Sequence, residues 1–558
     1  MKRPGASVPG LPRVSPAGAA AALVEWRSRR FAGLLSRSGI AGNPRKMAES
    51  SVRRTALAAA TAGPLGLALG LKVHPILFFV VLVPLAVFAF PEVRLRDAAS
   101  RRKEGVERTL PYFSILVNVM GGAGMSLYSM FEEIASSDVL GPMKREALRV
   151  RRDASVFGMD SNQAFERLAA SHPSRKLASF LYGYTSKVRS GGDMSAYLTG
   201  QSASFVKELE EAWGRYSDRA GIVGSLMITV FGVVPLLLLV ISIFSPAASV
   251  VGLLGFTGVA VPFFAAVLVL MAGRMQPAQD TNVHGKPLRS LLLSLVGIPL
   301  GYALGSAWAG AAMALSTFFI SYGLSVRREL ASATAVESAL PEFLKDVLEY
   351  KRQDYSLSKA LVHISTTNRY NAEFDRLLAA ISVQLRAGVP VEGLRVSTSC
   401  GLAALVFFLL GQMSRTGGGT VDTVFQMLQH TSSVVDAKRK ARVEMRPYLV
   451  LSFASPMMLA FGVTFVRGIL SSFGASFKLG LSGASIPTLQ IGTIPPALGQ
   501  VSDLLVVASA AALGIIGAKL TEFTVKSTLK ASLNLIVAVA VMVGLSAFGA
   551  GGIFHPSG

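Results

Sequence analysis

The chain has 558 residues, with 55 Lys and Arg against 33 Asp and Glu, and one cysteine, Cys400. Hydrophobic residues make up 51% and charged residues only 16%, which is too apolar for an ordinary soluble protein. One cysteine excludes an intrachain disulfide and a cysteine-based metal cluster. The net charge of +22 disfavours nucleic acid as a partner all the same, because the basic residues flank apolar blocks and no segment interleaves aromatic residues with Arg and Lys.

The apolar blocks predict nine membrane spans, since about 20 mostly apolar residues cross a bilayer. We expect them at residues 55–71, 74–91, 221–244, 249–273, 288–305, 307–323, 448–466, 503–518 and 531–549. A cytoplasmic N-terminus leaves only Lys72, Arg467 and Lys478 outside, so the charge predicts the orientation. The sequence therefore predicts an all-α, multi-pass protein of the cell membrane.

The expected organisation alternates membrane helices with two cytoplasmic helical-bundle domains. In chain order it is a basic N-terminal segment (1–54), a membrane hairpin (55–91), a first cytoplasmic domain (92–220), four membrane helices (221–323), a second cytoplasmic domain (324–447), three membrane helices with an outer loop at 471–502 (448–549) and an outer tail (550–558). The charged stretch from Met194 to Arg219 predicts a helix continuous with the third span. Pro235 and Pro456 predict kinks in two spans, and ordinary packing and a hinge both remain open.

The two polar segments repeat each other, mostly at an offset of 230 residues. Glu107, Leu110, Phe113, Ser126 and Gly158 recur as Glu337, Leu340, Phe343, Ser356 and Gly388. With small shifts, Phe180, Leu181, Gly183, Gly191 and Gly192 match Phe408, Leu409, Gly411, Gly417 and Gly418. We expect helix caps and turns at Gly124, Ser126, Gly158, Gly191, Gly192, Ser356, Gly388, Gly417 and Gly418.

No motif for catalysis or cofactor binding is found. A phosphate-binding loop needs Gly, four residues, then Gly-Lys-Ser or Gly-Lys-Thr, and the glycine runs do not fit that pattern. The six histidines lack the i, i+4 spacing and nearby carboxylates of a zinc site, so surface or cap roles are favoured. Ionisable residues are absent from the middle of every span, which disfavours coupled transport. We expect neither enzyme activity nor a metal or cofactor.

Three basic clusters remain as candidates for docking a partner. Arg101-Arg102-Lys103 and the set Lys438, Arg439, Lys440 and Arg442 adjoin spans, so membrane topology and anionic lipid are the favoured explanation, with docking as the alternative. The middle cluster lies far from any span, so topology does not explain it. Its residues, Lys144, Arg145, Arg149, Arg151 and Arg152, are the better candidates for contact with an acidic partner.

These residues resemble the type II secretion system F family, and most closely its long archaeal members of the FlaJ and TadC type. Leu110-Pro111, then Gly124-Met125-Ser126-Leu127 and Phe131-Glu132-Glu133-Ile134-Ala135, resemble the family's first helical hairpin, and Asp354-Tyr355-Ser356-Leu357 resembles the same element again. The resemblance implies a membrane platform of an archaellum or type IV pilus-like machine. It implies contact with a cytoplasmic hexameric secretion ATPase and with pilin or archaellin subunits, with hydrolysis belonging to the ATPase.

Other functions remain open from the residues alone. A multi-span transporter or permease with cytoplasmic regulatory domains is the first alternative, and a membrane-bound enzyme or signalling protein is the second. Within the favoured interpretation, an archaellum and an adhesion pilus are not separated. The oligomeric state is also open, although two copies in one chain make a monomer or homodimer the simplest match to a six-fold ATPase.

Overall fold

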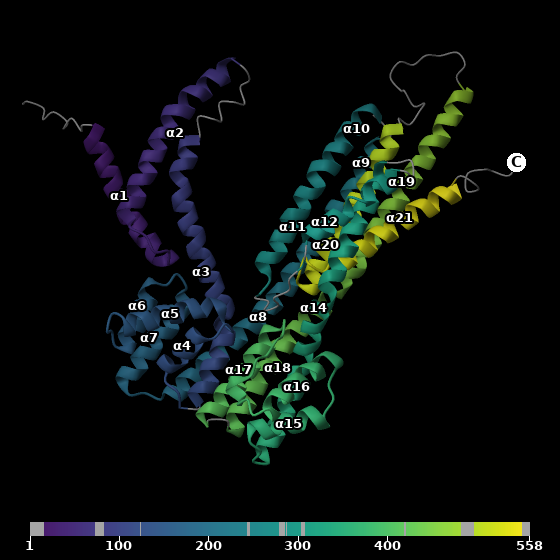
Figure 1. Cartoon of the computed structure of the whole chain (residues 1–558). Coiled ribbons are helices and arrows are strands. Elements are labelled where there is room, and N and C mark those ends of the chain that lie inside the picture. The colour runs from purple at the N-terminus through teal and green to yellow at the C-terminus, as the bar shows by residue number, and fades with distance from the viewer. Residues whose placement is uncertain are drawn as a thin grey trace, which may run out of the picture. The chain divides into compact units, whose positions relative to one another are not determined.

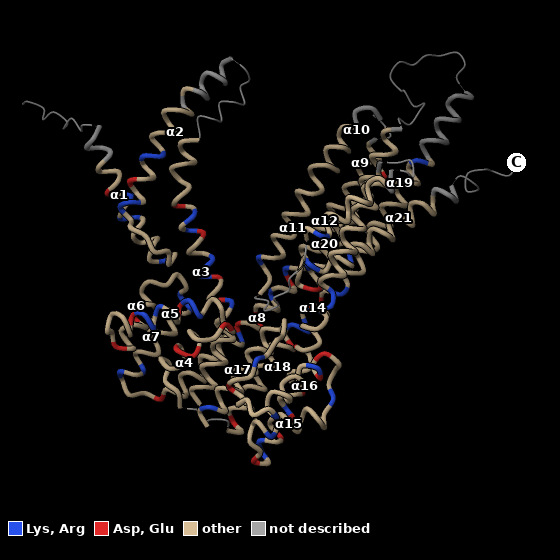
Figure 2. Tube along the Cα trace, viewed as in Figure 1, with Lys and Arg blue, Asp and Glu red and all other residues tan. Residues whose placement is uncertain are grey.

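The computed structural model describes residues 16–72, 83–122, 124–242, 246–277, 285, 287–302, 307–417, 420–480 and 496–549. Within these ranges the chain is almost entirely helical and contains no β-strand, so the predicted all-α fold is confirmed (Figure 1). Charged residues are dense along some helices and nearly missing from others (Figure 2). The chain is therefore a multi-pass membrane protein whose apolar helices alternate with charged helical segments.

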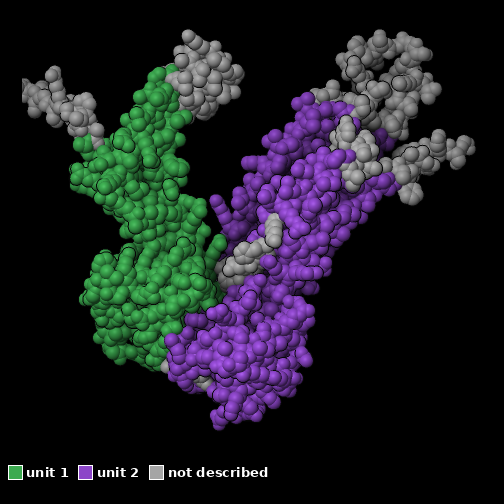
Figure 3. All heavy atoms as spheres, in the orientation of Figure 1, with its two compact units in different colours: residues 1–202 green, residues 203–558 purple. Residues whose placement is uncertain are grey.

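The chain divides into two compact units, Met1–Ser202 and Ala203–Gly558 (Figure 3). The first unit holds α1 (Pro16–Ser38), α2 (Pro44–Lys72), α3 (Val83–Gly122), α4 (Leu127–Ser136), α5 (Gly141–Ser155), α6 (Ser161–Ser171) and α7 (Arg175–Ser190). It also holds the start of α8 (Met194–Ile228). Helices α1, α2 and α3 pack on one another, and α4 to α7 gather around the far end of α3.

The second unit takes up the rest of α8 and all later helices. These are η2 (Thr229–Val233), α9 (Val234–Ser242), α10 (Pro246–Gly255), η3 (Phe256–Ala260), α11 (Val261–Met275), α12 (Pro287–Ser294), α13 (Gly297–Tyr302), α14 (Ala307–Arg352), α15 (Leu357–Thr367), α16 (Ala372–Arg386), η4 (Val391–Gly393), α17 (Gly401–Thr416), α18 (Val421–Glu444), α19 (Arg446–Gly480), α20 (Pro496–Glu522) and α21 (Leu529–Gly549). Helix α20 is largely buried and packs on α10, α11, α14, α19 and α21, so it is the central helix of the apolar bundle.

Five of the nine predicted spans lie in helices that are long and apolar enough to cross a membrane. These helices are Met194–Ile241, Val250–Met275, Trp308–Arg352, Val421–Gly468 and Ala497–Glu522. The ninth span lies in a shorter apolar helix, Leu529–Leu545. The first span falls within α2, and much of the second lies outside the described residues. Residues 481–495 of the predicted outer loop and the predicted tail, 550–558, also lie outside them.

The predicted fifth span is interrupted in the structure. Instead of one helix over 288–305, the described residues form α12 and α13 with a turn at Leu295 and Val296 between them. Gly297 begins α13 against the backbone of α14, where an added Cβ would lie 2.8 Å from the Cα of Ala314. A larger residue would force the two backbones apart, so the break and the glycine together allow α13 to approach α14 closely.

Each charged domain is held between two long helices that continue into apolar stretches. Helix α3 enters the first domain and a continuous 48-residue helix, Met194–Ile241, leaves it, as predicted from the stretch Met194 to Arg219. Likewise α14 enters the second domain and Val421–Gly468 leaves it. We call Met194–Ile241 and Val421–Gly468 the exit helices.

The π-helical turn η2 in the first exit helix ends two residues before Pro235. Prolines and π turns are both common causes of a kink in a helix. The kinks predicted at Pro235 and Pro456 stay predictions.

The two domains share the same pattern of caps and turns. Ser126 and Ser356 are the N-caps of α4 and α15, and each side chain accepts a hydrogen bond from the backbone N–H three residues on. Left-handed residues also fall in matching places, at φ values of +80° and +61° for Gly124 and Asp354, +63° and +83° for Gly158 and Gly388, and +65° and +67° for Gly191 and Gly417. Gly192 has no such φ, and Gly418 lies outside the described residues.

The cores of the two domains are built on equivalent phenylalanines. Phe113, at the buried end of α3, packs edge-on against Phe131 and Phe180. Its counterpart Phe343 on α14 contacts Phe374 and Phe407. The sequence match paired Phe180 with Phe408, whereas the residue that contacts Phe343 in the structure is the neighbouring Phe407. A difference of one residue turns a side chain by about 100° around a helix.

The domains differ in their third helix. In the first domain α6 spans Ser161–Ser171 and is capped by Asp160. In the second domain the equivalent stretch is the single turn η4 followed by a segment without helix up to Cys400. The repeat is therefore a copy of the framework helices, with one helix of the bundle reduced.

Candidate partner-docking surfaces

Helix α5 carries the middle basic cluster, and its sequence explains which side chains turn inward. Pro142 lies in its first turn, where a missing N–H costs nothing. The inward face runs along the helix at intervals of three and four residues. It consists of Met143, Glu146, Ala147, Val150 and Asp153. Two carboxylates therefore lie on the buried stripe, where each needs a partner because an isolated buried charge is strongly unfavourable.

Glu146 is 2% exposed and is held by two arginines. Arg102 of α3 makes a bidentate pair, with Nε 2.9 Å from Oε1 and Nη2 2.6 Å from Oε2. Arg149, one turn along α5, donates from Nη1 to Oε2 at 2.9 Å. His172 lies beside them, with Nε2 3.9 Å from Oε1. This cluster of Arg102, Glu146, Arg149 and His172, which we call the arginine clamp, joins α3, α5 and the α6–α7 connection.

The clamp shifts the acid–base behaviour of its members. Burial alone would raise the pKa of Glu146, but the hydrogen bond and charge of Arg102 and the charge of Arg149 outweigh it and lower that pKa. Burial lowers the pKa of His172 to about 4, against a partial opposing effect of Glu146. His172 is therefore neutral near pH 7, and its Nδ1 accepts a hydrogen bond from the backbone N–H of Ser174 at 3.0 Å. Of the surface and cap roles favoured from sequence, His172 has the cap role, because it is the buried C-cap residue of α6.

The same two arginines also hold the end of α1. The Nη1 of Arg102 donates to the carbonyls of Ser36 and Arg37 at 3.1 and 3.0 Å, and the Nη2 of Arg149 donates to the carbonyl of Gly39 at 3.1 Å. The last carbonyls of a helix have no partner within it and carry partial negative charge, so cations there are favourable. The arginine clamp therefore fastens α1 to the first domain.

The five residues predicted to form a docking face fall into two groups, those used in contacts within the domain and those exposed to a partner. Arg149 is used by the clamp, and Lys144 pairs with Asp138 at 2.6 Å. Arg152 pairs with Asp153 at 2.7 Å, but its side chain is half exposed. Arg145 and Arg151 are exposed on the outer side of α5. Arg145, Arg151 and Arg152 are therefore the members that a partner could reach, and we call them the α5 face.

The second predicted set, Lys438, Arg439, Lys440 and Arg442, also divides into buried and exposed residues. Lys438 is buried and forms an ion pair with Glu337 of α14. Arg442 is half-buried, with its guanidinium 5.7 Å from the ring centre of Phe523. Arg439 and Lys440 are exposed. Lys438 thus ties the second domain together, and Arg439 and Lys440 are the exposed members that a protein partner could reach.

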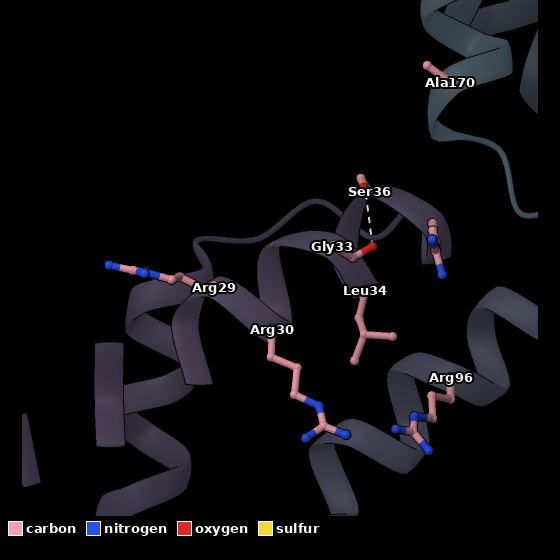
Figure 4. Close-up of a pocket in the computed structure, with 8 residues that line it drawn as sticks. Arg29, Arg30, Gly33, Leu34, Ser36, Arg96 and Ala170 are labelled. Atoms are coloured by element: carbon pink, nitrogen blue, oxygen red, sulfur yellow. Dashed lines mark hydrogen bonds between the residues drawn. The ribbon is translucent and has the colours of Figure 1, made fainter. Parts of the chain in front are cut away.

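A further group of arginines lies between α1 and α3. Arg29, Arg30, Arg37 and Arg96 line a cavity of about 480 Å³ (Figure 4). Arg30 pairs with Glu92 at 2.8 Å, and Arg96 pairs with the same carboxylate. Arg29 pairs with Glu25 at 2.7 Å. These two carboxylates offset half of the four arginine charges, so the cavity is a weaker candidate than the α5 face.

Sequence reasoning missed the arginine clamp. It explained Arg102 by membrane topology and gave Glu146 no role. One signal was present, since Glu146 stands on the apolar stripe of α5, where a carboxylate must be paired. Within the described residues no group of three or more His, Cys, Asp or Glu side chains is arranged to hold a metal ion.

Comparison with known proteins places the first domain in a family. Residues 113–242 match the family model described as "Type II secretion system (T2SS), protein F". A stretch of 96 residues is 27% identical to an uncharacterized protein of Methanocaldococcus jannaschii, and it covers 17% of this chain and 16% of that protein. The chain thus matches about one-sixth of that relative's length. No solved structure matches the chain.

The family match begins at Phe113, in the buried end of α3, and runs through α4 to α8 and on to Ser242, the last residue of α9. It therefore takes in the helical bundle and the long helix by which the bundle continues into an apolar stretch. The family is that of secretion- and pilus-type assembly platforms. This chain contains a type II secretion system F domain at residues 113–242.

Proposed function

We propose that this protein is the membrane platform of an archaellum or type IV pilus-like assembly machine, with its two helical domains on the cytoplasmic side. The observation that carries the proposal is the F domain itself, bounded by long helices that continue into apolar stretches. The second domain repeats its caps, turns and aromatic core. Two such domains give the platform two related surfaces for one motor.

The exit helices suggest how movement would be passed on. A 48-residue helix is about 70 Å long at 1.5 Å per residue, whereas the apolar core of a bilayer is about 30 Å thick. Half of each exit helix therefore stands outside the membrane and belongs to a domain. A rotation or displacement of the domain would move the membrane half with it. Pilin or archaellin subunits beside the membrane half would receive that movement.

The motor is proposed to be a cytoplasmic hexameric secretion ATPase, because the chain has no phosphate-binding loop of its own. Its docking sites are proposed to be the α5 face and the exposed pair Arg439 and Lys440. Exposed arginines and lysines on a rigid helix suit an acidic patch, where charge complementarity mainly speeds association and sets specificity. Such contacts should weaken as salt concentration rises.

Charge reversal of the α5 face tests this proposal. The variant with Arg145→Glu and Arg151→Glu should fold, because these two side chains are exposed and the ion pairs of the buried Glu146 and Asp153 are left intact. In cells that make the filament, we expect surface filaments to be lost and the secretion ATPase to fall at least tenfold in material captured with the tagged protein. Tenfold corresponds to about 1.4 kcal/mol, which two or three interfacial charges can supply.

The matched control reverses two exposed basic residues elsewhere, Arg175 and Lys187. This control should keep both filaments and ATPase capture, because the change in net charge is the same and only its place differs. If the α5-face variant assembles filaments and captures the ATPase as the unmodified protein does, the α5 face is not the docking site. If deleting the whole gene leaves every surface filament intact, the platform proposal itself fails.

A further inference from the structure

A large cavity lies in the second unit at the level where several apolar helices end. Its volume is about 1,000 Å³, and α14, α18, α19, α20 and α21 all contribute to it. On α19 and α21 the lining residues stand at the start of predicted spans, and on α14 and α20 they follow predicted spans. By the charge distribution this is the cytoplasmic side of the membrane. The cavity is therefore placed where the headgroups of the inner leaflet would lie.

The polar part of the lining is basic. Arg327, Arg442, Arg446 and Lys530 come from four different helices. The cavity also has two carboxylates, but Glu522 pairs with Lys530 at 2.7 Å and Glu337 pairs with Lys438. Among the described residues neither Arg327 nor Arg446 forms an ion pair, and both are exposed. The three arginines are thus left as surplus positive charge around one space.

The other part of the lining is apolar and continues toward the predicted membrane. Leu449, Leu529, Leu533 and Ile536 line the same cavity. Leu533 and Ile536 are about half exposed, at 52% and 46%, on a helix that is predicted to cross the bilayer. An arginine group joined to an apolar wall suits a ligand with an anionic head and a hydrocarbon tail. A free phosphate or nucleotide would leave the apolar wall without a partner.

We propose that this cavity binds an anionic phospholipid of the inner leaflet. Arg327, Arg442 and Arg446 hold the phosphate, and an acyl chain lies along Leu533 and Ile536. Guanidinium groups suit phosphate because they donate paired hydrogen bonds, and basic pockets at the cytoplasmic ends of membrane helices are known places for anionic headgroups. The bound lipid would link α14 and α18 of the second domain to the α20–α21 turn. This site is independent of the proposed function.

Binding can be measured on the purified full-length protein by native mass spectrometry. The probes are an anionic phosphoglycerol lipid and a neutral-headgroup phosphocholine lipid with the same acyl chains. We expect roughly tenfold tighter binding of the phosphoglycerol lipid, because the arginines attract a headgroup with net negative charge more strongly than a neutral one. The variant Arg327→Gln with Arg446→Gln should lose this preference. A control with Arg369→Gln and Arg386→Gln, two exposed arginines of the second domain, should keep it.

A second variant separates the tail from the head. Ile536→Asn should weaken binding of the phosphoglycerol lipid several-fold and leave any binding of inorganic phosphate unchanged, since only the acyl contact is altered. The proposal is overturned if the unmodified protein binds the two lipids equally, or if the Arg327 and Arg446 variant keeps the preference. It is also overturned if inorganic phosphate binds as tightly as the lipid. Capture of an acidic protein segment in place of lipid would likewise reject it.

Discussion

The two helical domains share a framework and differ in what their charges do. In the first, Arg102 and Arg149 hold a buried carboxylate and the end of α1 together. In the second, the positions equivalent to Arg102 and Glu146 are Ser332 and Arg376, so the same ion pair is not available. In the second domain the pair Glu337 and Lys438 joins α14 to α18. Some residues of a basic cluster can thus hold a preceding helix in place by hydrogen bonds. Contact with a partner is then expected only from the residues of the cluster that stay exposed.

Removing the clamp carboxylate should give the largest difference between the domains. Glu146→Ala leaves Arg102, whose side chain is 8% exposed, buried without a counter-ion. We expect the first domain to lose about 3 to 5 kcal/mol of stability, while the second is unchanged. Hydrogen exchange of the two domains within the same sample measures this. Equal loss in both domains would mean that the clamp is not a local structure.

Lowering the pH should give the second-largest difference between the domains, because it should destabilise the first domain more than the second. The pKa of His172 is about 4 in the folded state and 6.5 ordinarily. Between these pH values the imidazole is therefore protonated in the unfolded chain and neutral in the folded chain. Stability contributed by neutral His172 is therefore present above pH 6.5 and lost as the pH falls toward 4, by about 3 kcal/mol. Glu146 acts in the same direction at lower pH, because its lowered pKa stabilises the fold only while the group is ionised.

The measurement is hydrogen exchange of α5 and α7 between pH 7 and 4.5, corrected for the intrinsic rate. The second domain should lose less, since it has Arg376 at the position of the clamp carboxylate Glu146, although burial lowers the pKa of its His430 as well. The variant His172→Gln should flatten the first domain's dependence. A dependence that survives in His172→Gln would assign the effect to other groups.

Truncation of Arg149 should release α1 without unfolding the domain. Arg149→Ala removes the hydrogen bond to the carbonyl of Gly39 and keeps the bidentate pair between Arg102 and Glu146. We expect a loss of about 1 to 2 kcal/mol, seen as faster exchange and proteolysis of α1. Arg145→Ala on the same helix is the control and should have no effect. Unchanged protection of α1 would show that the hydrogen bonds from Arg102 and the apolar contacts hold it without Arg149.

The smallest effect should be equal in the two domains. Gly191 and Gly417 end α7 and α17 in the left-handed region, with open space around each. Gly191→Ala and Gly417→Ala should each cost about 1 kcal/mol, because only backbone strain is added. Thermal unfolding or local exchange can compare them directly. Clearly unequal costs would mean that the two turns are not structurally equivalent.

Much of the framework follows from local patterns in the sequence. The caps Ser126 and Ser356, the left-handed glycines and the continuous exit helices depend on residues a few positions apart, so the repeat could be predicted. The apolar spans could be predicted for the same reason. The break in the fifth span depends on packing against α14, and the pairing of Phe343 with Phe407 depends on helix rotation, so both required the three-dimensional structure.

The candidate sites were less predictable because they join distant parts of the chain. Arg102 lies 44 residues from Glu146, and Arg149 lies 110 residues from Gly39. A run of basic residues gives no sign of which members turn inward. The stripe of α5 could have marked Glu146 as buried, but nothing near it names α1 as the element that the arginines hold. The phospholipid cavity gathers its arginines from three helices and was not foreseen either.

The most direct test of the platform account is photo-crosslinking in living cells. A photoreactive amino acid is placed at Arg145, Arg151 or Arg439, and the attached proteins are identified by mass spectrometry. The account predicts adducts with a secretion-type ATPase at these positions, and none at Arg175 as the control. Adducts with proteins from the outer side of the membrane, or an ATPase attached equally at Arg175, would contradict it.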